Sequence, residues 1–554
     1  MSVKTIDSVM LAKMFLSGAK SLENKKDYIN ELNVFPVPDG DTGTNMTLTI
    51  MSAAKDVNGL ENPDMKSLCK SMSSGSLRGA RGNSGVILSQ LLRGFTKVAK
   101  EYDEIDAAII SAGFDKAVES AYKAVMKPKE GTILTVAKAA AVKANSLFED
   151  GVEDLDEFFK GIIEAAKVSL DNTPELLPVL KEAGVVDSGG AGLLEILNGA
   201  YDAFCGKEIV FTMDDDTAKV AGETRMFETS SGKIESDLKY IYATDIIFST
   251  VNKTFNLQHE SDYKRYLENI GEDVKIDVKD TEVAVSLVTN DPGLVLQKAL
   301  KYGPLTKVSV DNLKKEDKAE IDAPVKVSKK IEGPKKPVGF IAVSVGAGIA
   351  EVFKNLGVDY LIEGGQTMNP STEDMLNAID QVNAETIFIL PNNKNIVMAA
   401  NQARDMTEDK RVIVIPTKTV PQGISAVISY VSDSSVEENQ DSMLAEISLV
   451  KTGQVTYAVR DTVIDGCEIH QDDYMGIGDK GILSNGNDIE KVTIEMVDKM
   501  VEDDSEIITI YYGEDIKEDD ANKLKSLIQE KHSDLEVELQ AGGQPIYYYI
   551  ISVE

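Results

Sequence analysis

Histidine is scarce in this chain. The 554 residues include three histidines, His259, His470 and His532, and none stands before position 259. Nucleophilic centres of the Ser-His-Asp or Cys-His kind need an imidazole as the base. The sequence therefore excludes such a centre in the first half of the chain unless another part supplies the histidine. Proton or charge chemistry there must use carboxylates, amides, lysine, arginine or a metal ion.

Cysteines and long apolar runs are also few. The three cysteines are far apart and form no CxxC pair, so they predict buried thiols in a reducing cytoplasm and not a disulfide framework. Uncharged stretches such as Val338 to Ala350 are too short to span a bilayer. The first 26 residues lack the apolar core and cleavage site of a signal peptide. We therefore expect a cytoplasmic protein with no integral membrane segment.

Basic residues are outnumbered. Lysine and arginine total 58 against 92 acidic residues, which gives a formal net charge of -34. Because phosphates repel an acidic surface, this balance opposes non-specific binding to nucleic acid or anionic lipid. Hydrophobic residues make up 42% of the chain, enough for full cores, and the length predicts about three or four domains.

The first domain, residues 1–208, is predicted to be all-α. Apolar residues recur every three to four positions from Ile6 to Leu22, which is typical of an amphipathic helix. The same pattern predicts further helices over Gly85–Ala99, Ile105–Val125, Thr132–Leu147, Leu155–Leu170 and Gly190–Phe204. Short turns rich in glycine, serine and aspartate separate these helices.

A central domain, residues 223–313, is predicted to be α+β. The order of its segments is strand, helix, two strands, helix, strand, which is the ferredoxin-like split unit. Residues 314–337 follow, rich in lysine and proline and without an apolar period, and we expect an extended hinge linker there.

The last domain, residues 338–554, is predicted to be a two-lobed α/β region. Apolar strands alternate with helices in its first part, which indicates a parallel sheet covered on both faces. Beyond Ala445 we expect a second section whose strands lie in EISLVK, VTYAVRD, EIITIYYG, LEVELQ and YYYIISV.

The strongest local signal is the stretch NVFPVPDGDTGTNM, residues 33–46. Asp39 and Asp41 stand two residues apart and offer hard oxygen ligands to small cations. Thr44 or Asn45 is expected to cap a helix that begins near Met46, and the free N–H groups of such a helix start attract an anion. Carboxylates for magnesium beside a helix start for phosphate form the combination that a nucleotide site needs.

Three further loops share this chemistry: GARGNSG at 79–85, KPKEGT at 127–132 and VVDSGGAG at 185–192. Each leads into a predicted helix, and Thr132 is an expected cap. Taken singly, each loop is more typical of an ordinary helix connection. Four of them in one helical domain with paired aspartates predict a joint nucleotide site. It is neither a Walker A loop nor a protein-kinase site, because the domain has no GxxxxGK[ST] and no histidine.

These motifs, in this order, carry a family resemblance. Residues 1–208 resemble the nucleotide-binding domain of dihydroxyacetone kinase L subunits, an eight-helix barrel, and are most similar to the ATP-binding subunit of bacterial fatty acid kinase. The resemblance covers the whole chain, since that subunit joins a central domain and a DegV-like C-terminal domain to the barrel. Gly364 to Ser371 resemble part of that last domain, which is expected to dock a partner.

The resemblance implies a site for ATP and two magnesium ions. Asp39 and Asp41 would be the catalytic metal ligands, with Asn33 as a third ligand. The residues expected to cradle the phosphates are Thr42, Gly43, Thr44, Asn45, Asn83 and Ser84. Those expected to line the nucleoside side are Gly131, Thr132, Asp187, Ser188 and Gly189.

The implied reaction is phosphorylation of a fatty acid to an acyl phosphate. The fatty acid would be presented by a separate DegV-type carrier protein, and the subunit would be a homodimer with no nucleic acid partner. A carboxylate acceptor needs no general base, which agrees with the absence of histidine. Two alternatives stay open: a kinase for a small polyol such as dihydroxyacetone, and a non-catalytic ATP-binding scaffold that docks a lipid carrier.

The central domain departs from the family pattern. Relatives are expected to carry a cysteine and a His-x-His where this chain has Ala243, Ser286 and Val288. All three potential soft-metal ligands are replaced, so we expect no zinc there. The change also gives the scaffold alternative some support.

Overall fold

The computed structural model describes most of the chain, which folds into two compact units. The described residues are 3–34, 40–125, 127–207, 242–249, 257–268, 270–279, 282–290, 292–312, 335–364, 369–458, 461–464, 467–479 and 481–554. One compact unit combines Met1–Ala221 with Lys330–Glu554, and Gly222–Lys329 form the other. Among the described residues, no helix is long and apolar enough to cross a membrane.

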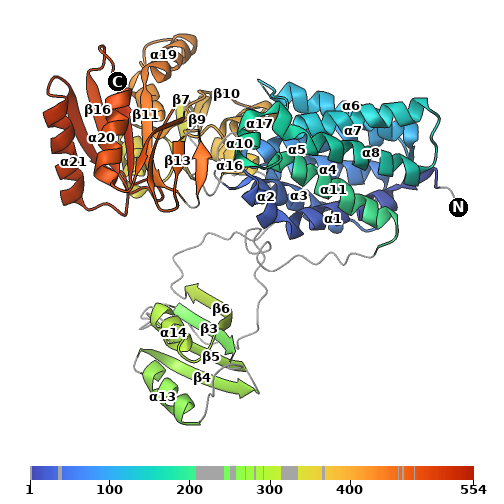
Figure 1. The fold of residues 1–554 in the computed structure, drawn as a ribbon, viewed down its shortest axis with the longest axis horizontal. Helices are drawn as coiled ribbons and strands as arrows, with labels where there is room; N and C mark the ends of the chain where they lie inside the picture. Colours follow the sequence, from blue (N-terminus) through green and yellow to red (C-terminus); the bar gives the residue numbers. More distant parts are fainter. Residues whose placement is uncertain are drawn as a thin grey trace. The chain divides into compact units, whose positions relative to one another are not determined.

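The helical region, residues 3–207, is a bundle whose long helices run roughly along one direction (Figure 1). Its helices are α1 Ser8–Asn24, α2 Lys26–Glu31, α3 Thr42–Asn58, α4 Met65–Gly79, α5 Gly82–Ala99, α6 Ala107–Ala124, α7 Ile133–Glu149, α8 Leu155–Asp171, α9 Thr173–Leu176, α10 Pro178–Ala183 and α11 Ser188–Phe204. One apolar core joins them, with Ile50, Leu68 and Phe158 fully buried.

A small ribbon corrects the expectation of a purely helical first domain. Strand β1, Thr5–Asp7, pairs antiparallel with β2, Glu104–Asp106. Ile6 and Ile105 lie in these strands, so α1 and α6 begin later than the apolar periodicity predicted. Asp7 and Asp106 fix the new starts, because each carboxylate accepts a hydrogen bond from the backbone of the following helix.

The central unit is an antiparallel sheet with two helices. Its elements in chain order are β3 Tyr242–Ser249, α13 Leu257–Glu268, β4 Gly271–Lys279, β5 Glu282–Thr289, α14 Pro292–Ala299 and β6 Leu305–Asn312. The sheet order is β4-β5-β3-β6. Its core holds Phe248 and Tyr263, both fully buried, and the Tyr263 hydroxyl donates to the Val295 carbonyl at 3.2 Å. The expected hinge at 314–337 lies outside the described residues up to 334, and Lys336 and Pro337 belong to the next strand.

The C-terminal region, described from residue 335, starts with a parallel sheet of order β10-β9-β7-β8. Within β7, Phe340 and Ala342 face one core while Ile341 and Val343 face another, so both faces are covered. That burial explains the continuous apolar strands. The strands are β7 Lys336–Ser344, β8 Tyr360–Glu363, β9 Ala384–Leu390 and β10 Arg411–Val414, and the helices are α15 Ala347–Asn355, α16 Thr372–Gln381, α17 Val397–Met406, α18 Val420–Ile428 and α19 Val436–Leu449.

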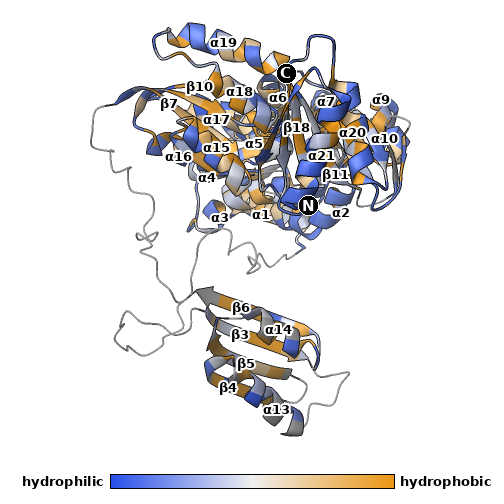
Figure 2. Cartoon of the chain, turned by 90° about the vertical axis from the view of Figure 1, so that its left-hand side faces the viewer, coloured by the Kyte–Doolittle hydropathy of each residue, from blue (hydrophilic) through white to orange (hydrophobic). Residues whose placement is uncertain are grey.

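A second, mixed sheet of order β15-β14-β11-β18-β16-β17 completes the C-terminal region. Figure 2 shows apolar colour on strands such as β7 and β18 and polar colour on the outward helix α21. The elements are β11 Lys451–Tyr457, β12 Thr462–Ile464, β13 Cys467–Ile469, β14 Tyr474–Gly478, β15 Gly481–Gly486, α20 Ile489–Met500, β16 Ile507–Tyr512, α21 Glu518–Lys531, β17 Glu536–Ala541 and β18 Tyr549–Val553; β12 and β13 pair with each other.

The strand expected in EISLVK is wrong. Glu446 to Leu449 form the end of α19, and the first strand of the second sheet starts at Lys451. A capping box explains the helix: the Ser435 hydroxyl accepts from the Glu438 N–H, and the Glu438 carboxylate accepts from the Ser435 backbone. This signal lies ten residues before the apolar run and overrides its strand propensity.

Candidate phosphate and metal site

Helix α3 begins earlier than its sequence predicted. Its first residue is Thr42 and its N-cap is Asp41, so the expected start near Met46 with a Thr44 or Asn45 cap is wrong. The Asp41 carboxylate makes no capping bond to its own helix. The neighbouring helix α2 provides that cap instead: Asn30 Oδ1 accepts from the Thr44 N–H, and Asn30 Nδ2 donates to the Thr44 hydroxyl, both at 3.0 Å.

Close packing of α2 against α3 makes this possible. A Cβ at Gly43 would lie 2.1 Å from the Lys26 carbonyl oxygen, so only glycine fits there. Because Asn30 takes over the capping, the Asp41 carboxylate is directed to partners outside its own helix. Asn30 could not be found from the sequence, since no local pattern shows which helix packs on the start of another.

Two of the three predicted metal ligands are described. Asp39 lies outside the described residues. Asn33 is buried just after α2, where its N–H donates to the Asn30 carbonyl at 3.1 Å, and Asp41 is half-buried. Among the described residues, no group of three or more histidine, cysteine, aspartate or glutamate side chains is placed to hold a metal ion.

The start of α5 meets the start of α3. Gly82 has a φ of +57°, and a Cβ there would lie 2.6 Å from Asn45 Nδ2. A Cβ at Gly85 would lie 2.3 Å from the Thr49 hydroxyl. The structure thus brings the predicted residues Asn83 and Ser84, in the first turn of α5, to the predicted phosphate residues of α3.

The starts of α7 and α11 form a second pair, joined by Asp187. Thr132 is at the N-cap position of α7, as predicted, but its hydroxyl donates to the Lys129 carbonyl at 2.8 Å and makes no capping bond. Asp187 is the N-cap of α11. The Asp187 carboxylate accepts from the Gly190 N–H at 2.7 Å and also bonds the backbone of Ile133. Burial raises the pKa of Asp187 to about 6, although the two backbone hydrogen bonds act to lower it. Ser188 and Gly189 are buried in the first turn of α11, and Gly131 has a φ of +82°.

The two pairs lie at the same end of the helical region. One turn inside each helix, a Cβ at Gly192 of α11 would lie 2.8 Å from the Met46 thioether of α3. Four helix starts therefore gather at one end of the bundle. The partial positive charge of these helix starts favours an anion at this end.

The C-terminal region contributes to the same end, which the sequence did not predict. Asn369 Nδ2 donates to Asp41 Oδ2 at 2.6 Å, and the Asn369 carbonyl accepts from the Arg81 guanidinium at 2.9 Å. The Thr372 N–H donates to the Ala80 carbonyl at 3.1 Å. Asn369 lies in the Gly364–Ser371 motif that was expected to dock a partner, and residues 365–368 of that motif lie outside the described residues.

Further polar contacts between the helical and C-terminal regions form a contact surface along α5. Asn83 Nδ2 donates to Asn395 Oδ1 at 3.0 Å. Gln402 Nε2 donates to the Leu77 carbonyl at 2.7 Å, and Gln402 Oε1 accepts from Gln90 at 3.0 Å. An apolar cluster of Ala80, Val86, Met398 and Ala399 lies on the same surface.

One orphaned atom tests whether the residues present suit a divalent cation. Asn369 is 2% exposed, and its Oδ1 has no hydrogen-bond partner among the described residues. Its Nδ2 holds the Asp41 carboxylate. A carboxylate and an amide oxygen are hard ligands of the kind that magnesium prefers. These side chains therefore fit a hard cation beside the helix starts.

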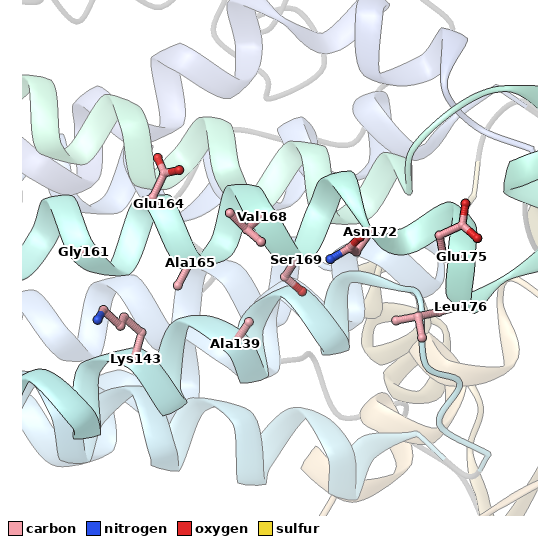
Figure 3. A pocket seen from close by; sticks show the side chains of 10 residues that line it. All are labelled: Ala139, Lys143, Gly161, Glu164, Ala165, Val168, Ser169, Asn172, Glu175 and Leu176. Carbon is pink, nitrogen blue, oxygen red and sulfur yellow. The ribbon is translucent and has the colours of Figure 1, made fainter.

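An open groove of about 830 Å³ lies elsewhere, between α7 and α8 (Figure 3). Ala139 and Lys143 of α7 and Gly161 and Glu164 of α8 are among the residues that line it. None of the predicted site residues lines it. Leu176, which lines the groove, nevertheless lies beside the second pair of helix starts, because a Cβ at Gly131 would be 3.1 Å from the Leu176 Cβ.

In the central unit, the register of β3 and β5 places three positions on one face. Ala243 pairs directly with Val288, and Ser286 lies two residues from Val288 on the same strand. These are the positions at which a cysteine and two histidines were expected in relatives. Side chains there would share one face, and in this chain that face carries an alanine, a serine and a valine.

Comparisons with known proteins define the class of the chain. The DAK2 domain family matches residues 36–202, the fatty acid kinase FakA-like middle-domain family matches 239–320, and the fatty acid kinase FakA-like C-terminal family matches 339–554. The chain is thus a multidomain protein with a helical DAK2 domain and a C-terminal α/β domain.

Whole-length relatives agree with these matches. Protein YloV of Bacillus subtilis is 42% identical over 560 residues, and the uncharacterized protein SAR1202 of Staphylococcus aureus is 42% identical over 563; each match covers 100% of both chains. The chain belongs to the FakA-like family of fatty acid kinase proteins.

Solved structures with some likeness include two kinds of protein. A DegV family protein from Ruminococcus gnavus is 16% identical with a TM-score of 0.32, covering 40% of this chain and 100% of that one. The dihydroxyacetone kinase from C. freundii in complex with AMP-PNP and Mg2+ is 15% identical with a TM-score of 0.29, covering 35% of this chain and 34% of that one.

Proposed function

We propose that this protein is the ATP- and magnesium-dependent kinase subunit that phosphorylates a fatty acid carboxylate to an acyl phosphate. The observation that carries this proposal is that four helix starts gather at one end of the helical region, where the Asp41 carboxylate is not used to cap its own helix. An anion-binding end beside such a carboxylate suits a magnesium-bound nucleotide.

The helix starts would hold the phosphates. The residues assigned to them are Thr42, Gly43, Thr44 and Asn45 in α3, with Asn83 and Ser84 in α5. Gly131, Thr132, Asp187, Ser188 and Gly189, from the second pair of helix starts, would line the nucleoside side. Asp39, Asp41 and Asn33 would hold magnesium, two ions by family resemblance, and magnesium when bound neutralises charge on the phosphates.

In the proposed reaction, the side chains position the reactants and need not act as a general base. An oxygen of the fatty acid carboxylate forms a bond to the γ-phosphorus while the bond from that phosphorus to the ADP oxygen breaks. The carboxylate is ionised at neutral pH, so no proton has to be removed from the acceptor. The aligned N–H groups stabilise charge on the transferring phosphoryl group, which agrees with the lack of histidine in this region.

The remaining assignments follow from the family. We propose that the helical region is an eight-helix barrel, that the central unit is a ferredoxin-like domain, and that the DegV-like C-terminal region docks the lipid carrier. The carrier would be a separate fatty-acid-binding protein of the DegV type, and the kinase subunit would act as a homodimer in the cytoplasm.

Transfer of labelled phosphate from ATP to oleate loaded on a carrier tests the proposal. We expect magnesium-dependent turnover that falls at least ~100-fold in Asp41→Ala, because a charged anchor of the transition state is lost. Asp64→Ala is the matched control. Asp64 is also an N-cap aspartate, of α4, and it lies outside the proposed site, so its variant should keep near-native turnover. Equal turnover in both variants would refute the assignment of Asp41.

One observation favours a second function, that of an ATP-binding scaffold. The face of β3 and β5 that carries Ala243, Ser286 and Val288 lacks the side chains expected in relatives. Tight binding of magnesium and ATP without turnover on any carrier would support the scaffold. Turnover with dihydroxyacetone in place of oleate would instead support a small-polyol kinase.

A further inference from the structure

Asn369 joins the C-terminal region to the proposed phosphate site. It stands 328 positions from Asp41 in the sequence, and its side-chain Nδ2 donates to Asp41 Oδ2 at 2.6 Å. Its backbone is fixed as well, because the Asn369 carbonyl accepts from Arg81 at 2.9 Å. Arg81 is the N-cap residue of α5. One asparagine thus contacts the start of both helices assigned to the phosphates.

The orientation of the Asn369 side-chain amide leaves its Oδ1 without a hydrogen-bond donor among the described residues. With Nδ2 engaged by Asp41, the other atom of the amide is Oδ1, which can only accept hydrogen bonds or coordinate a cation. Oδ1 is buried and has no partner among the described residues. A buried acceptor without a partner is costly, so native proteins rarely keep one without a reason.

The neighbouring charge decides what would satisfy this atom. The Asp41 carboxylate lies within hydrogen-bond distance of the same amide, so an anion directly at Oδ1 would be repelled by both oxygens. A divalent cation, or a water bound to it, is attracted to both. The pair therefore presents two oxygens of the type that binds magnesium.

We propose that Asn369 is a metal-site residue contributed by the C-terminal region, with its Oδ1 directed to the divalent cation or to the water that the cation holds. This inference rests on the proposed function, since it adds a residue to the same site. The helical region alone then lacks one oxygen of its metal site, and the site is complete only when the C-terminal region is in contact with Ala80 and Arg81.

The test is a titration of the full chain with Mn2+ in the presence of adenylyl imidodiphosphate, followed by electron paramagnetic resonance. We expect Asn369→Ala to bind Mn2+ about 10-fold more weakly than the native chain, because a charge-assisted contact is lost. Asn369→Asp keeps an oxygen at Oδ1 and adds charge, so it should bind Mn2+ within about 2-fold of native or more tightly. A role that only positions Asp41 predicts the opposite, since two carboxylates repel.

Asn439→Ala is the matched control for the loss of a buried asparagine. Asn439 is 3% exposed in the same region, and its amide donates to the nearby carbonyls of Val431, Ser434 and Ser435. Its variant should therefore bind Mn2+ like the native chain. Thermal unfolding without metal checks that all variants are folded.

The outcomes separate this inference from the proposed function. Native Mn2+ affinity in Asn369→Ala, or equally weak binding in Asn369→Ala and Asn369→Asp, overturns the role of Asn369 and leaves the kinase proposal standing. Failure of the native chain to bind Mn2+ with the nucleotide analogue overturns both.

Discussion

At the scale of single residues, Asp187 is the clearest case of a side chain whose chemistry is set by its surroundings. It caps α11, bonds the first turn of α7, and is 5% exposed. Loss of water disfavours its charged form more than the two N–H groups favour it, and the pKa rises to about 6. A carboxyl group that joins two helix starts therefore titrates close to neutral pH.

This shift predicts a pH dependence of stability. The pKa of Asp187 is about 6 in the folded chain and near 3.8 when unfolded, so between these values the folded state binds the proton more tightly. Its contribution to the free energy of unfolding is fully present below pH 3.8 and falls by about 3 kcal/mol as the pH rises through 6. Calorimetric unfolding at pH 4.5 and 7.5 measures this fall in the free energy of unfolding. The Asp187→Asn variant should show a smaller fall than the native chain, because it lacks the titrating carboxyl group. Parallel pH profiles for native and variant would contradict the shift.

The loops of the site and the N-cap of α7 could be predicted from the sequence, but the N-cap of α3 and the residues that join the elements could not. Thr132 and the Asp187 loop were predicted because a cap is a local pattern of small and acidic residues before an apolar run. Asn30 and Asn369 were missed because their roles depend on packing. Asn30 acts 14 positions away on Thr44, and Asn369 acts on a helix 328 positions away. The Asn369 contact lies outside any sequence window, and the Asn30 contact, although close in sequence, follows no local pattern.

At the scale of elements, the turn into α5 combines two constraints. Gly82 needs a positive φ, and its missing Cβ leaves room for the Asn45 side chain. The positive φ affects the stability of the turn, whereas the missing Cβ affects the position of Asn45 in the site. Gly184, the C-cap of α10, has a similar φ of +66°, but a Cβ there would meet no atom within 4 Å. Gly184 therefore shares the positive φ of Gly82 but has no neighbouring side chain that a Cβ would displace.

We therefore expect Gly82→Ala and Gly184→Ala to differ in function more than in stability. Each should lose about 1–2 kcal/mol of unfolding free energy, the cost of a side chain in the left-handed region. Only Gly82→Ala should weaken binding of adenylyl imidodiphosphate, by about 10-fold, because its Cβ displaces Asn45. Isothermal titration calorimetry on both variants measures this difference. Equal affinities would mean that Asn45 is not a phosphate residue.

Element types were predictable where periodicity was long, and boundaries were not. The long helices α5, α7, α8 and α11 lie where the apolar period placed them. The ribbon of β1 and β2 was hidden because three-residue strands are too short to show a period. In α19 the apolar residues of EISLV resemble a strand, and the helix is decided by the capping box upstream.

At the scale of the whole molecule, the contact between the helical and C-terminal regions depends on amides. Gln402 is 7% exposed and bonds Leu77, Gln90 and Thr372. Removing its side chain leaves several buried groups without partners, and each such group is costly. The Thr372 N–H, which donates to the Ala80 carbonyl, reports whether the two regions are in contact.

We expect Gln402→Ala to loosen this contact by about 2–4 kcal/mol without unfolding either region. Hydrogen exchange of the Thr372 amide should become faster by at least ~10-fold, while amides inside α3 and β9 keep their native protection. Unchanged exchange at Thr372 would mean that Gln402 does not hold the regions together.

The inserted position of the central unit has a consequence for synthesis on the ribosome. About 100 residues separate Ala221 from Lys330, and at about 5–20 residues per second the nascent helical region waits roughly 5–20 s longer for its counterpart. During that interval, the surface of the helical region that will contact the C-terminal region is exposed to water. Arg81, Asn83 and Gln90 remain hydrated there at little cost, whereas a broad apolar face would attract other unfinished chains. Polar side chains in the contact therefore suit a surface that is exposed to water before the C-terminal region is synthesised.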